Sequence, residues 1–120
     1  ELLAMPGSFG TLAYLGDLPV GLVIALAAGP DAEILTLGVL PSFRRRGIAH
    51  RLLASAGERA AAAGCERLVL DVAEDNVAAY ALYRRLGFAD IARRPAYYRR
   101  PSGAAVAAIV LARSLKNSGI

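Results

Sequence analysis

Residues Pro41–Leu53 read PSFRRRGIAHRLL, and this stretch decides how the rest of the chain is interpreted. Three consecutive arginines lead into Gly47, and an amphipathic helix is predicted to begin directly after it. A helix N-terminus carries unpaired N–H groups and a partial positive charge, so it favours a phosphate group. Gly47 lets a ligand approach the backbone, and the arginines can add charge-assisted hydrogen bonds. The stretch is therefore a candidate phosphate-binding loop.

Two other interpretations compete for the same stretch. Most runs of charge are solvated surface loops, and three arginines by themselves do not exclude that. A nucleic-acid surface would need aromatic side chains or a second basic patch nearby. Arg93-Arg94 and Arg99-Arg100, with Tyr97 and Tyr98 between them, are candidates for such a patch. The elements around the stretch have to decide between the three interpretations.

The composition favours one cytoplasmic domain. The chain has 120 residues, which suits a single hydrophobic core, and its formal net charge of +4 fits an anionic ligand as well as a nucleic acid. Although 56% of the residues are hydrophobic, no apolar run approaches the roughly 18 residues of a membrane span. The one cysteine, Cys65, cannot form an intramolecular disulfide, which favours a reducing compartment. One histidine and one cysteine do not predict a metal site.

Hydrophobic periodicity predicts eight elements in the order β-β-β-α-β-α-β-β. Such an order implies a mixed sheet with helices packed on it, an α/β or α+β fold. Gly64 and Gly87 are predicted to end the two helices, and Asp75 or Asn76 to cap the second one. The predicted ranges are strands 11–15, 20–27 and 33–39, a helix at 47–63, a strand at 67–72, a helix at 76–86, and strands 88–93 and 104–112.

Several spaced motifs agree with these elements. Arg44, Gly47 and Ala49 follow a strand in the pattern R-x-x-G-x-A. Asn76 opens the second helix, which continues into Leu82–Phe88, LYRRLGF. From about Ala32 to Ala112 the chain resembles the GNAT superfamily of acetyl-CoA-dependent N-acetyltransferases. Within it the chain is most similar to the RimI-type branch, which acetylates a ribosomal-protein alanine; the residues that carry this likeness are Ala32–Leu35, Leu70–Val72, and Arg93-Arg94 shortly before Tyr97-Tyr98.

The resemblance implies a mostly antiparallel sheet in which two central parallel strands splay apart, with helices on both sides. Acetyl-CoA would lie between those strands, 33–39 and 67–72. The backbone of Leu37, Gly38 and Val39 would pair with the pantetheine arm, and Asn76 would hydrogen-bond it. The pyrophosphate would be held by the loop and first helical turn, namely Arg44, Arg45, Arg46, Gly47, Ile48, Ala49 and His50.

The resemblance also implies the catalytic roles. Tyr83 lies seven residues after Asn76, two helical turns, so the two side chains share a face. A tyrosine hydroxyl can protonate the leaving thiolate, and the backbone N–H of Val39 can meet the oxyanion. A base must remove a proton from the amine, and Asp71 and Glu33 are both candidates, with Asp71 ahead. Asn76 could equally be a plain helix cap, and Tyr83 a plain core aromatic.

The sequence says least about the acceptor substrate. The enzyme interpretation favours a protein N-terminal α-amine, with Tyr97 and Tyr98 lining a peptide groove. A small-molecule amine, an amino acid, or a non-catalytic acyl-CoA-binding module are the alternatives. Residues 1–120 are expected to form a single domain without the strand and helices that usually begin this family, as a monomer or homodimer. No nucleic-acid partner, membrane association or metal is expected.

Overall fold

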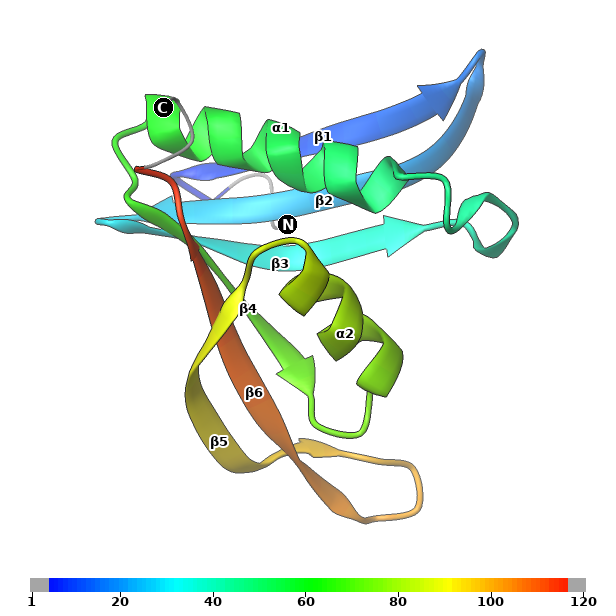
Figure 1. The fold of residues 1–120 in the computed structure, drawn as a ribbon, viewed down its shortest axis with the longest axis vertical. Coiled ribbons are helices and arrows are strands. Elements are labelled where there is room, and N and C mark those ends of the chain that lie inside the picture. The colour runs from blue at the N-terminus through cyan, green and yellow to red at the C-terminus, as the bar shows by residue number, and fades with distance from the viewer. Residues whose placement is uncertain (1–4, 117–120) are drawn as a thin grey trace. The chain divides into compact units, whose positions relative to one another are not determined.

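In the computed structural model, residues 5–116 are described. They form a six-stranded sheet with the strand order β1-β2-β3-β4-β6-β5, two α-helices and one short 3₁₀ helix, η2 (Figure 1). Neither helix in this part of the chain is both long and apolar enough to cross a membrane. The elements are β1 (Ser8–Leu15), β2 (Leu18–Ala28), β3 (Asp31–Val39), η2 (Pro41–Phe43), α1 (Ile48–Ala62), β4 (Arg67–Ala73), α2 (Val77–Arg85), β5 (Ala89–Arg99) and β6 (Ala105–Ser114).

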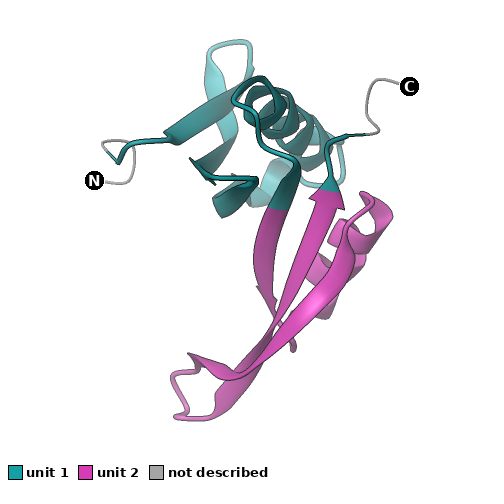
Figure 2. Ribbon diagram, turned by 90° about the vertical axis from the view of Figure 1, so that its left-hand side faces the viewer, with its two compact units in different colours: residues 1–68, 114–120 teal, residues 69–113 magenta. Residues whose placement is uncertain are grey.

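The chain divides into two compact units (Figure 2). Unit 1 comprises residues 1–68 and 114–120, and unit 2 comprises residues 69–113. Strand β4 contributes its first two residues to unit 1 and the others to unit 2. Each unit has its own internal contacts and contains some of the predicted site residues.

Unit 1 is an antiparallel meander covered by α1. Strand β1 pairs with β2, and β2 pairs with β3, both antiparallel. Helix α1 lies along these strands (Figure 1) and buries Leu52, Leu53 and Ala56. Val20 and Val23 of β2 are 1% exposed, so they belong to the same core. The alternating apolar residues of β2 pack against the apolar face of the amphipathic helix α1, and this burial holds the two elements together.

The ends of α1 follow from its sequence. Gly47 is the N-cap with a φ of 79°, and Gly64 follows the C-terminus with a φ of 91°. The N–H of Gly64 donates to Ala61 O and that of Cys65 to Ala60 O, so two carbonyls of the last turn are satisfied. Cys65 is buried, as expected for a small residue after a helix. The predicted helix is confirmed to within one residue at each end.

The start of β4 belongs to unit 1 and lies beside the start of β3. The N–H groups of Glu66 and Arg67 both donate to Pro30 O. The Arg67 guanidinium donates to both carboxylate oxygens of Asp31, at 2.8 and 3.3 Å. Two strands that begin side by side and are joined by a helix run parallel, and this is the one parallel pair of the sheet. The predicted mixed, mostly antiparallel fold is confirmed.

Unit 2 contains most of β4, helix α2 and the antiparallel hairpin of β5 and β6. Its core includes Leu70 and Val72 of β4, Phe88, and Val110 and Leu111 of β6. Asn76, not Asp75, is the N-cap of α2, and Gly87 follows the helix with a φ of 93°. The predicted order of elements is therefore confirmed in this unit as well.

One boundary in unit 2 was predicted wrongly. The sequence predicted a strand ending at Arg93, whereas β5 continues to Arg99. Its pairing with β6 is interrupted between Arg94 and Tyr98, where Pro95 and Ala96 bulge out of the ladder. Because β5 is an edge strand, a proline without an N–H is tolerated at such a bulge. Tyr97 and Tyr98 therefore lie on a strand and not in a connecting loop.

Candidate functional site

The predicted phosphate-binding loop connects β3 to α1 in unit 1. The 3₁₀ helix η2 follows β3, and the chain then reaches α1 through two residues with positive φ, Arg45 at 64° and Gly47 at 79°. Within residues 5–116, none of the backbone amides from Arg45 to His50 donates to a backbone carbonyl. A run of unpaired amides at a helix start, next to left-handed residues, is typical of an anion-binding backbone.

Gly47 is required by its conformation and not by crowding. A Cβ built at this position would meet no atom of the described chain within 4 Å. Its φ of 79° is nevertheless one that a side chain rarely adopts. Open space above the glycine leaves room for a ligand to approach the amides of the first turn, which fits a pyrophosphate.

The three arginines of the loop have different environments. Arg44 Nε donates to Val39 O at 3.1 Å, so this guanidinium supports the end of β3. Arg46 lies over the Phe43 ring, 5.0 Å from its centroid. Arg45 has neither kind of contact among the described residues, and its side chain is exposed. The three arginines are thus not equivalent, and Arg45 is the one whose guanidinium makes neither a hydrogen bond nor a ring contact within the described residues.

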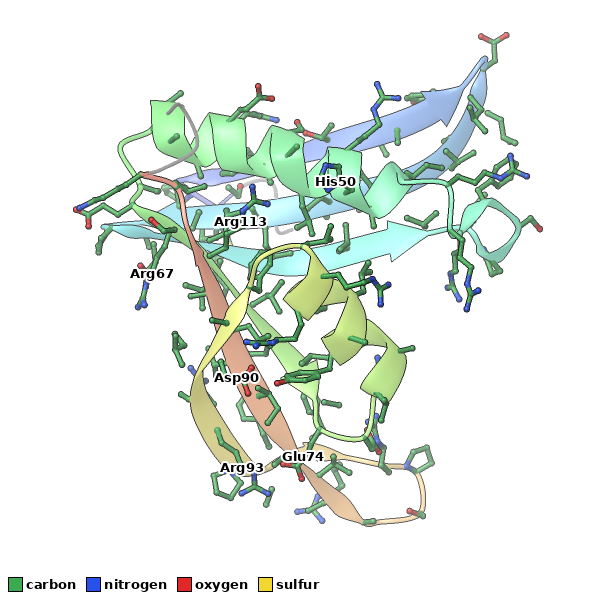
Figure 3. All side chains as sticks on the ribbon, viewed as in Figure 1. His50, Arg67, Glu74, Asp90, Arg93 and Arg113 are labelled. Atoms are coloured by element: carbon green, nitrogen blue, oxygen red, sulfur yellow. The ribbon has the colours of Figure 1, made fainter. Side chains whose placement is uncertain are left out.

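The predicted pantetheine strand is the end of β3. Leu37, Gly38 and Val39 pair with β2 along one of their sides. A Cβ at Gly38 would meet no atom within 4 Å in the described chain, so this backbone lies beside open space. Glu33, the second candidate base, is an exposed residue nearer the start of the same strand. His50 is exposed in the first turn of α1 (Figure 3).

In unit 2, helix α2 carries two of the predicted residues. Asn76 Oδ1 accepts a hydrogen bond from the Ala79 N–H at 3.3 Å, so the capping role is present. Tyr83 is partly buried, and its ring meets Phe88 edge to face at a centroid distance of 6.0 Å. Within the described part of the chain its hydroxyl makes no hydrogen bond. Burial, and then the neighbouring Tyr98, raise the pKa of Tyr83, so the hydroxyl keeps its proton at neutral pH.

Asp71 lies in β4 on the face opposite the buried Leu70 and Val72. Its carboxylate makes no ion pair within residues 5–116. The pKa of Tyr98 is raised first by burial and then by the negative charge of Asp71. Since Tyr98 in turn raises the pKa of Tyr83, unit 2 brings a carboxylate and two tyrosines within electrostatic reach of one another.

Sequence reasoning did not find this grouping. Tyr98 was predicted as a residue of an acceptor groove or of a basic surface patch, and it lies on a different element from Asp71 and Tyr83. No local pattern connects a residue of β4 to one of β5, because their proximity depends on the register of the hairpin. The remaining predicted residues divide between the units: Glu33 and positions 37–50 lie in unit 1, and Asp71, Asn76 and Tyr83 lie in unit 2.

A separate groove in unit 1 lies between β1 and α1. It has a volume of about 330 Å³ and shares only Ile48 with the predicted site residues. Leu12 and Tyr14 on its β1 side are 56% and 55% exposed. The lining residues are Thr11, Leu12, Ala13, Tyr14, Leu15, Val20, Ile48, Arg51, Leu52 and Ser55. The described residues contain no group of three or more histidines, cysteines and carboxylates that could hold a metal ion.

Comparison with known proteins gives a consistent result. Residues 2–88 match the Acetyltransferase (GNAT) family. A [ribosomal protein bS18]-alanine N-acetyltransferase from Haemophilus influenzae is 30% identical over 120 residues, which cover 90% of this chain and 82% of that protein. The corresponding protein of Haemophilus ducreyi is 34% identical over 82 residues, 68% of this chain.

Some relatives extend well beyond the matched part. The match covers 57% of the H. ducreyi protein. An uncharacterised protein of Mycobacterium leprae is 44% identical over 68 residues, which are 57% of this chain and 18% of that protein. The chain therefore corresponds to less than two thirds of the length of these two relatives.

Solved structures have the same fold. The ribosomal-protein-S18-alanine N-acetyltransferase of Escherichia coli superposes with a TM-score of 0.83 at 25% identity, over 96% of this chain and 74% of that one. Nourseothricin acetyltransferase gives a TM-score of 0.85 at 26% identity, over 92% and 66%. An acetyltransferase of Bacillus subtilis, solved in complex with CoA, gives 0.79 at 20% identity, over 92% and 78%.

Proposed function

Because the chain belongs to the acetyltransferase (GNAT) family, we propose that it transfers an acetyl group from acetyl-CoA to a primary amine. The observation that carries the proposal is the β3–α1 loop, whose amides from Arg45 to His50 have no backbone acceptor and whose Gly47 lies beside open space. The residues that match the family, 2–88, include this loop. Together the family match and the loop favour a cofactor with a pyrophosphate over a solvated basic loop or a nucleic acid.

The cofactor would be held by backbone groups more than by side chains. The amides of the first turn of α1, with Arg45 and Arg46, would bind the pyrophosphate. The end of β3 from Leu37 to Val39 would pair with the pantetheine arm, and Asn76 would add a hydrogen bond to it. Acetyl-CoA supplies the activated acyl group, and the residues of this chain orient it and handle the protons.

Two proton transfers are needed. Tyr83 would donate its hydroxyl proton to the leaving sulfur, and its raised pKa keeps that proton available at neutral pH. Asp71 would accept the proton of the attacking amine, directly or through one water, because its carboxylate is free of ion pairs within the described residues. Glu33 is the alternative base. The amide of Val39 would donate to the oxyanion.

For the acceptor, we propose a protein or peptide N-terminal α-amine. The two Haemophilus relatives and the E. coli structure are enzymes named for a ribosomal-protein alanine. Tyr97, which is 49% exposed, and Tyr98 present aromatic surface on β5 that could contact such a peptide. A small-molecule amine is the second candidate, because nourseothricin acetyltransferase matches the fold at a comparable identity.

The test begins with binding. Thermal unfolding would be followed with acetyl-CoA, dephospho-CoA and ATP, all at one concentration of about 100 times the dissociation constant expected for acetyl-CoA, where a specific ligand adds about 2.7 kcal/mol. We expect a shift with acetyl-CoA and none with ATP. Release of coenzyme A would then be measured with peptides that begin with Ala or Ser, polyamines and aminoglycoside-type amines. Binding without turnover on any amine would contradict the enzymatic proposal and favour an acyl-CoA-binding module.

A further inference from the structure

Two consecutive carboxylates at the β4–α2 turn each make a two-pronged ion pair with an arginine, one in the middle of β5 and one directly after this strand. The Arg93 guanidinium donates to both carboxylate oxygens of Glu74, at 2.7 and 3.2 Å (Figure 3). The Arg100 guanidinium donates to both oxygens of Asp75, through Nε at 3.1 Å and through Nη2. We refer to these four residues as the arginine clamp. All four belong to unit 2.

The clamp spans one strand. Strand β6 lies between β4 and β5 in the sheet order. The two ion pairs therefore connect the turn after β4 to β5 and the residue that follows it, although β4 and β5 are not neighbours. The turn is also tied to β6 itself, since the Glu74 N–H donates to Ala107 O at 2.8 Å. Side chains that reach across a strand fix the relative position of elements that backbone pairing alone does not join.

The bulge of β5 lies between the two clamping arginines. Arg94 pairs with Ala108 and Tyr98 with Val106, so Pro95, Ala96 and Tyr97 stand opposite Ala107 alone. Ala96 has a φ of 53°, a conformation that costs energy for a residue with a side chain. The same residue of β6, Ala107, therefore faces the bulge and accepts the hydrogen bond of the clamped turn.

Each side of the clamp carries groups of the proposed site. Asn76, the cap of α2, follows Asp75 directly, and Tyr83 lies two turns further along the helix. On β5 the bulge includes Tyr97 and is followed by Tyr98, and the two rings meet edge to face at a centroid distance of 5.2 Å. Arg94 lies over the Tyr97 ring at 5.3 Å. A movement of the bulge relative to the turn would change the position of Tyr98, whose pKa is raised in part by Asp71 and which in turn raises the pKa of Tyr83.

We propose that Arg93 and Arg100 are positioning residues, which hold the tyrosine-bearing bulge of β5 in register with the start of α2 through Glu74 and Asp75. This inference rests on the proposed function, because it assigns the held tyrosines to the acceptor side of that site. The guanidinium fork fits a carboxylate with two hydrogen bonds in a fixed plane, a geometry that lysine cannot supply. The clamp fixes an orientation, and its role is distinct from that of a stabilising core contact.

The energetics separate these two roles. Exposed ion pairs contribute little to folding, so loss of one pair should hardly change the melting temperature. Misplacement of a reacting or substrate-binding group by about 1 Å can cost up to about 100-fold in rate. If the ion pairs have no positioning role, their loss should change neither the melting temperature nor the rate. If they position the tyrosines, their loss should lower the rate and leave the melting temperature unchanged.

The test compares Arg93→Gln and Arg100→Gln with the matched control Arg99→Gln. Arg99 is on the same strand, and its guanidinium donates only to Gly103 O within the described residues. In the two clamp variants we expect kcat to fall about tenfold, with the melting temperature within about 2 °C of the unchanged protein. The control should retain kcat within about twofold. The exchanged pair Glu74→Arg with Arg93→Glu should recover most of the lost rate.

A second readout does not depend on turnover. The Glu74 N–H donates to Ala107 O, and the Ala79 N–H in the first turn of α2 donates to Asn76 Oδ1; amide hydrogen exchange at both should accelerate several-fold in the clamp variants and not in the control. Unchanged exchange, or faster exchange with an unchanged kcat, would overturn the inference. If the unchanged protein acetylates no amine, the proposed function fails, while faster exchange in the clamp variants alone would still establish that the clamp holds the turn.

Discussion

At the scale of single residues, the hydroxyl of Tyr83 is the group whose loss should be most informative. Tyr83→Phe keeps the ring against Phe88 and removes an oxygen that has no hydrogen-bond partner within residues 5–116. We expect kcat to fall at least about 100-fold, because the leaving thiolate loses its proton donor. The melting temperature should not change. Coenzyme A release and thermal unfolding measure the two quantities.

The raised pKa of Tyr83 gives this prediction a second check. Burial holds the pKa above its ordinary value near 10, so the alkaline limb of the kcat–pH profile should lie above pH 10 in the unchanged protein. A kcat within threefold of the unchanged protein after Tyr83→Phe would remove the tyrosine from the proton-transfer step and leave it as a core aromatic.

The identity of the base is also decided by single residues. Asp71→Asn and Glu33→Gln each remove one carboxylate, and neither side chain makes an ion pair in the described chain. We expect Asp71→Asn to lower kcat/KM about 100-fold at pH 7 and Glu33→Gln to change it less than threefold. Steady-state assays with one peptide acceptor compare the two variants directly. The opposite ranking would identify Glu33 as the base.

Asp71→Asn has a consequence that needs no turnover. Burial and then the negative charge of Asp71 raise the pKa of Tyr98, so removal of that charge should lower the pKa while the effect of burial remains. Tyrosinate absorbance would be titrated in proteins with and without the Tyr98→Phe substitution, and the difference isolates Tyr98 from the other four tyrosines.

At the scale of elements, helix α2 shows how one residue can have a local and a functional role. Asn76 caps the helix, so Asn76→Ala should cost about 1 kcal/mol of unfolding free energy. Asn76→Asp keeps a capping oxygen and should leave stability within about 0.5 kcal/mol. If the amide also binds the cofactor, Asn76→Asp should still raise the KM for acetyl-CoA about tenfold. Urea unfolding and steady-state kinetics make the comparison.

An unchanged KM in Asn76→Asp would mean that the residue only caps the helix. The N-cap itself was readable from sequence, since an asparagine that precedes an amphipathic run is a local signal. What the sequence left open was the choice between Asp75 and Asn76. In the structure Asn76 caps the helix, and the carboxylate of Asp75 pairs with Arg100, 25 residues away.

The end of strand β5 could not be predicted from the local sequence pattern. The sequence predicted a strand that ended at Arg93, two residues before Pro95, a residue without an N–H to donate to a ladder. The structure continues the strand through a bulge, because an edge strand needs donors on only one side. Whether a strand lies at an edge is a property of the sheet order, and no window of sequence around Pro95 contains it.

At the scale of the whole molecule, the exposed ion pairs of the clamp add a small dependence of stability on pH. Hydrogen bonds from Arg93 and Arg100 lower the pKa of Glu74 and Asp75, respectively. A lowered native pKa contributes stability above the unfolded value of about 4 and loses it as pH falls through the native value. We therefore expect the urea concentration at the unfolding midpoint to decrease once the pH is lower than about 4. The decrease should be smaller in the double variant Glu74→Gln with Asp75→Asn.

A matched control is Asp17→Asn in the β1–β2 turn, which removes a carboxylate that has no ion pair within the described residues. Its midpoint should follow that of the unchanged protein through the acid range. Equal acid sensitivity in the double variant and the unchanged protein would show that the clamp carboxylates have the same pKa in the folded and unfolded states.

The sequence by itself determined the order of the elements, both helices to within about one residue at each end, the glycines that end them, and the family. These features are local, because they depend on hydrophobic periodicity, caps and motifs within one or two turns of chain. That the two compact units act as one acetyltransferase domain stays a prediction of the sequence. The catalytic assignments to Tyr83, Asp71 and Glu33 likewise stay predictions.

Only the tertiary structure decided which distant residues meet. It paired Glu74 with Arg93 across 19 positions and Asp75 with Arg100 across 25, and it brought Tyr98 within electrostatic reach of Asp71. The physical reason is register. A bulge at Pro95 and Ala96 shifts every later residue of β5 relative to β6, so the partners of its side chains follow from strand pairing and cannot be read from spacing.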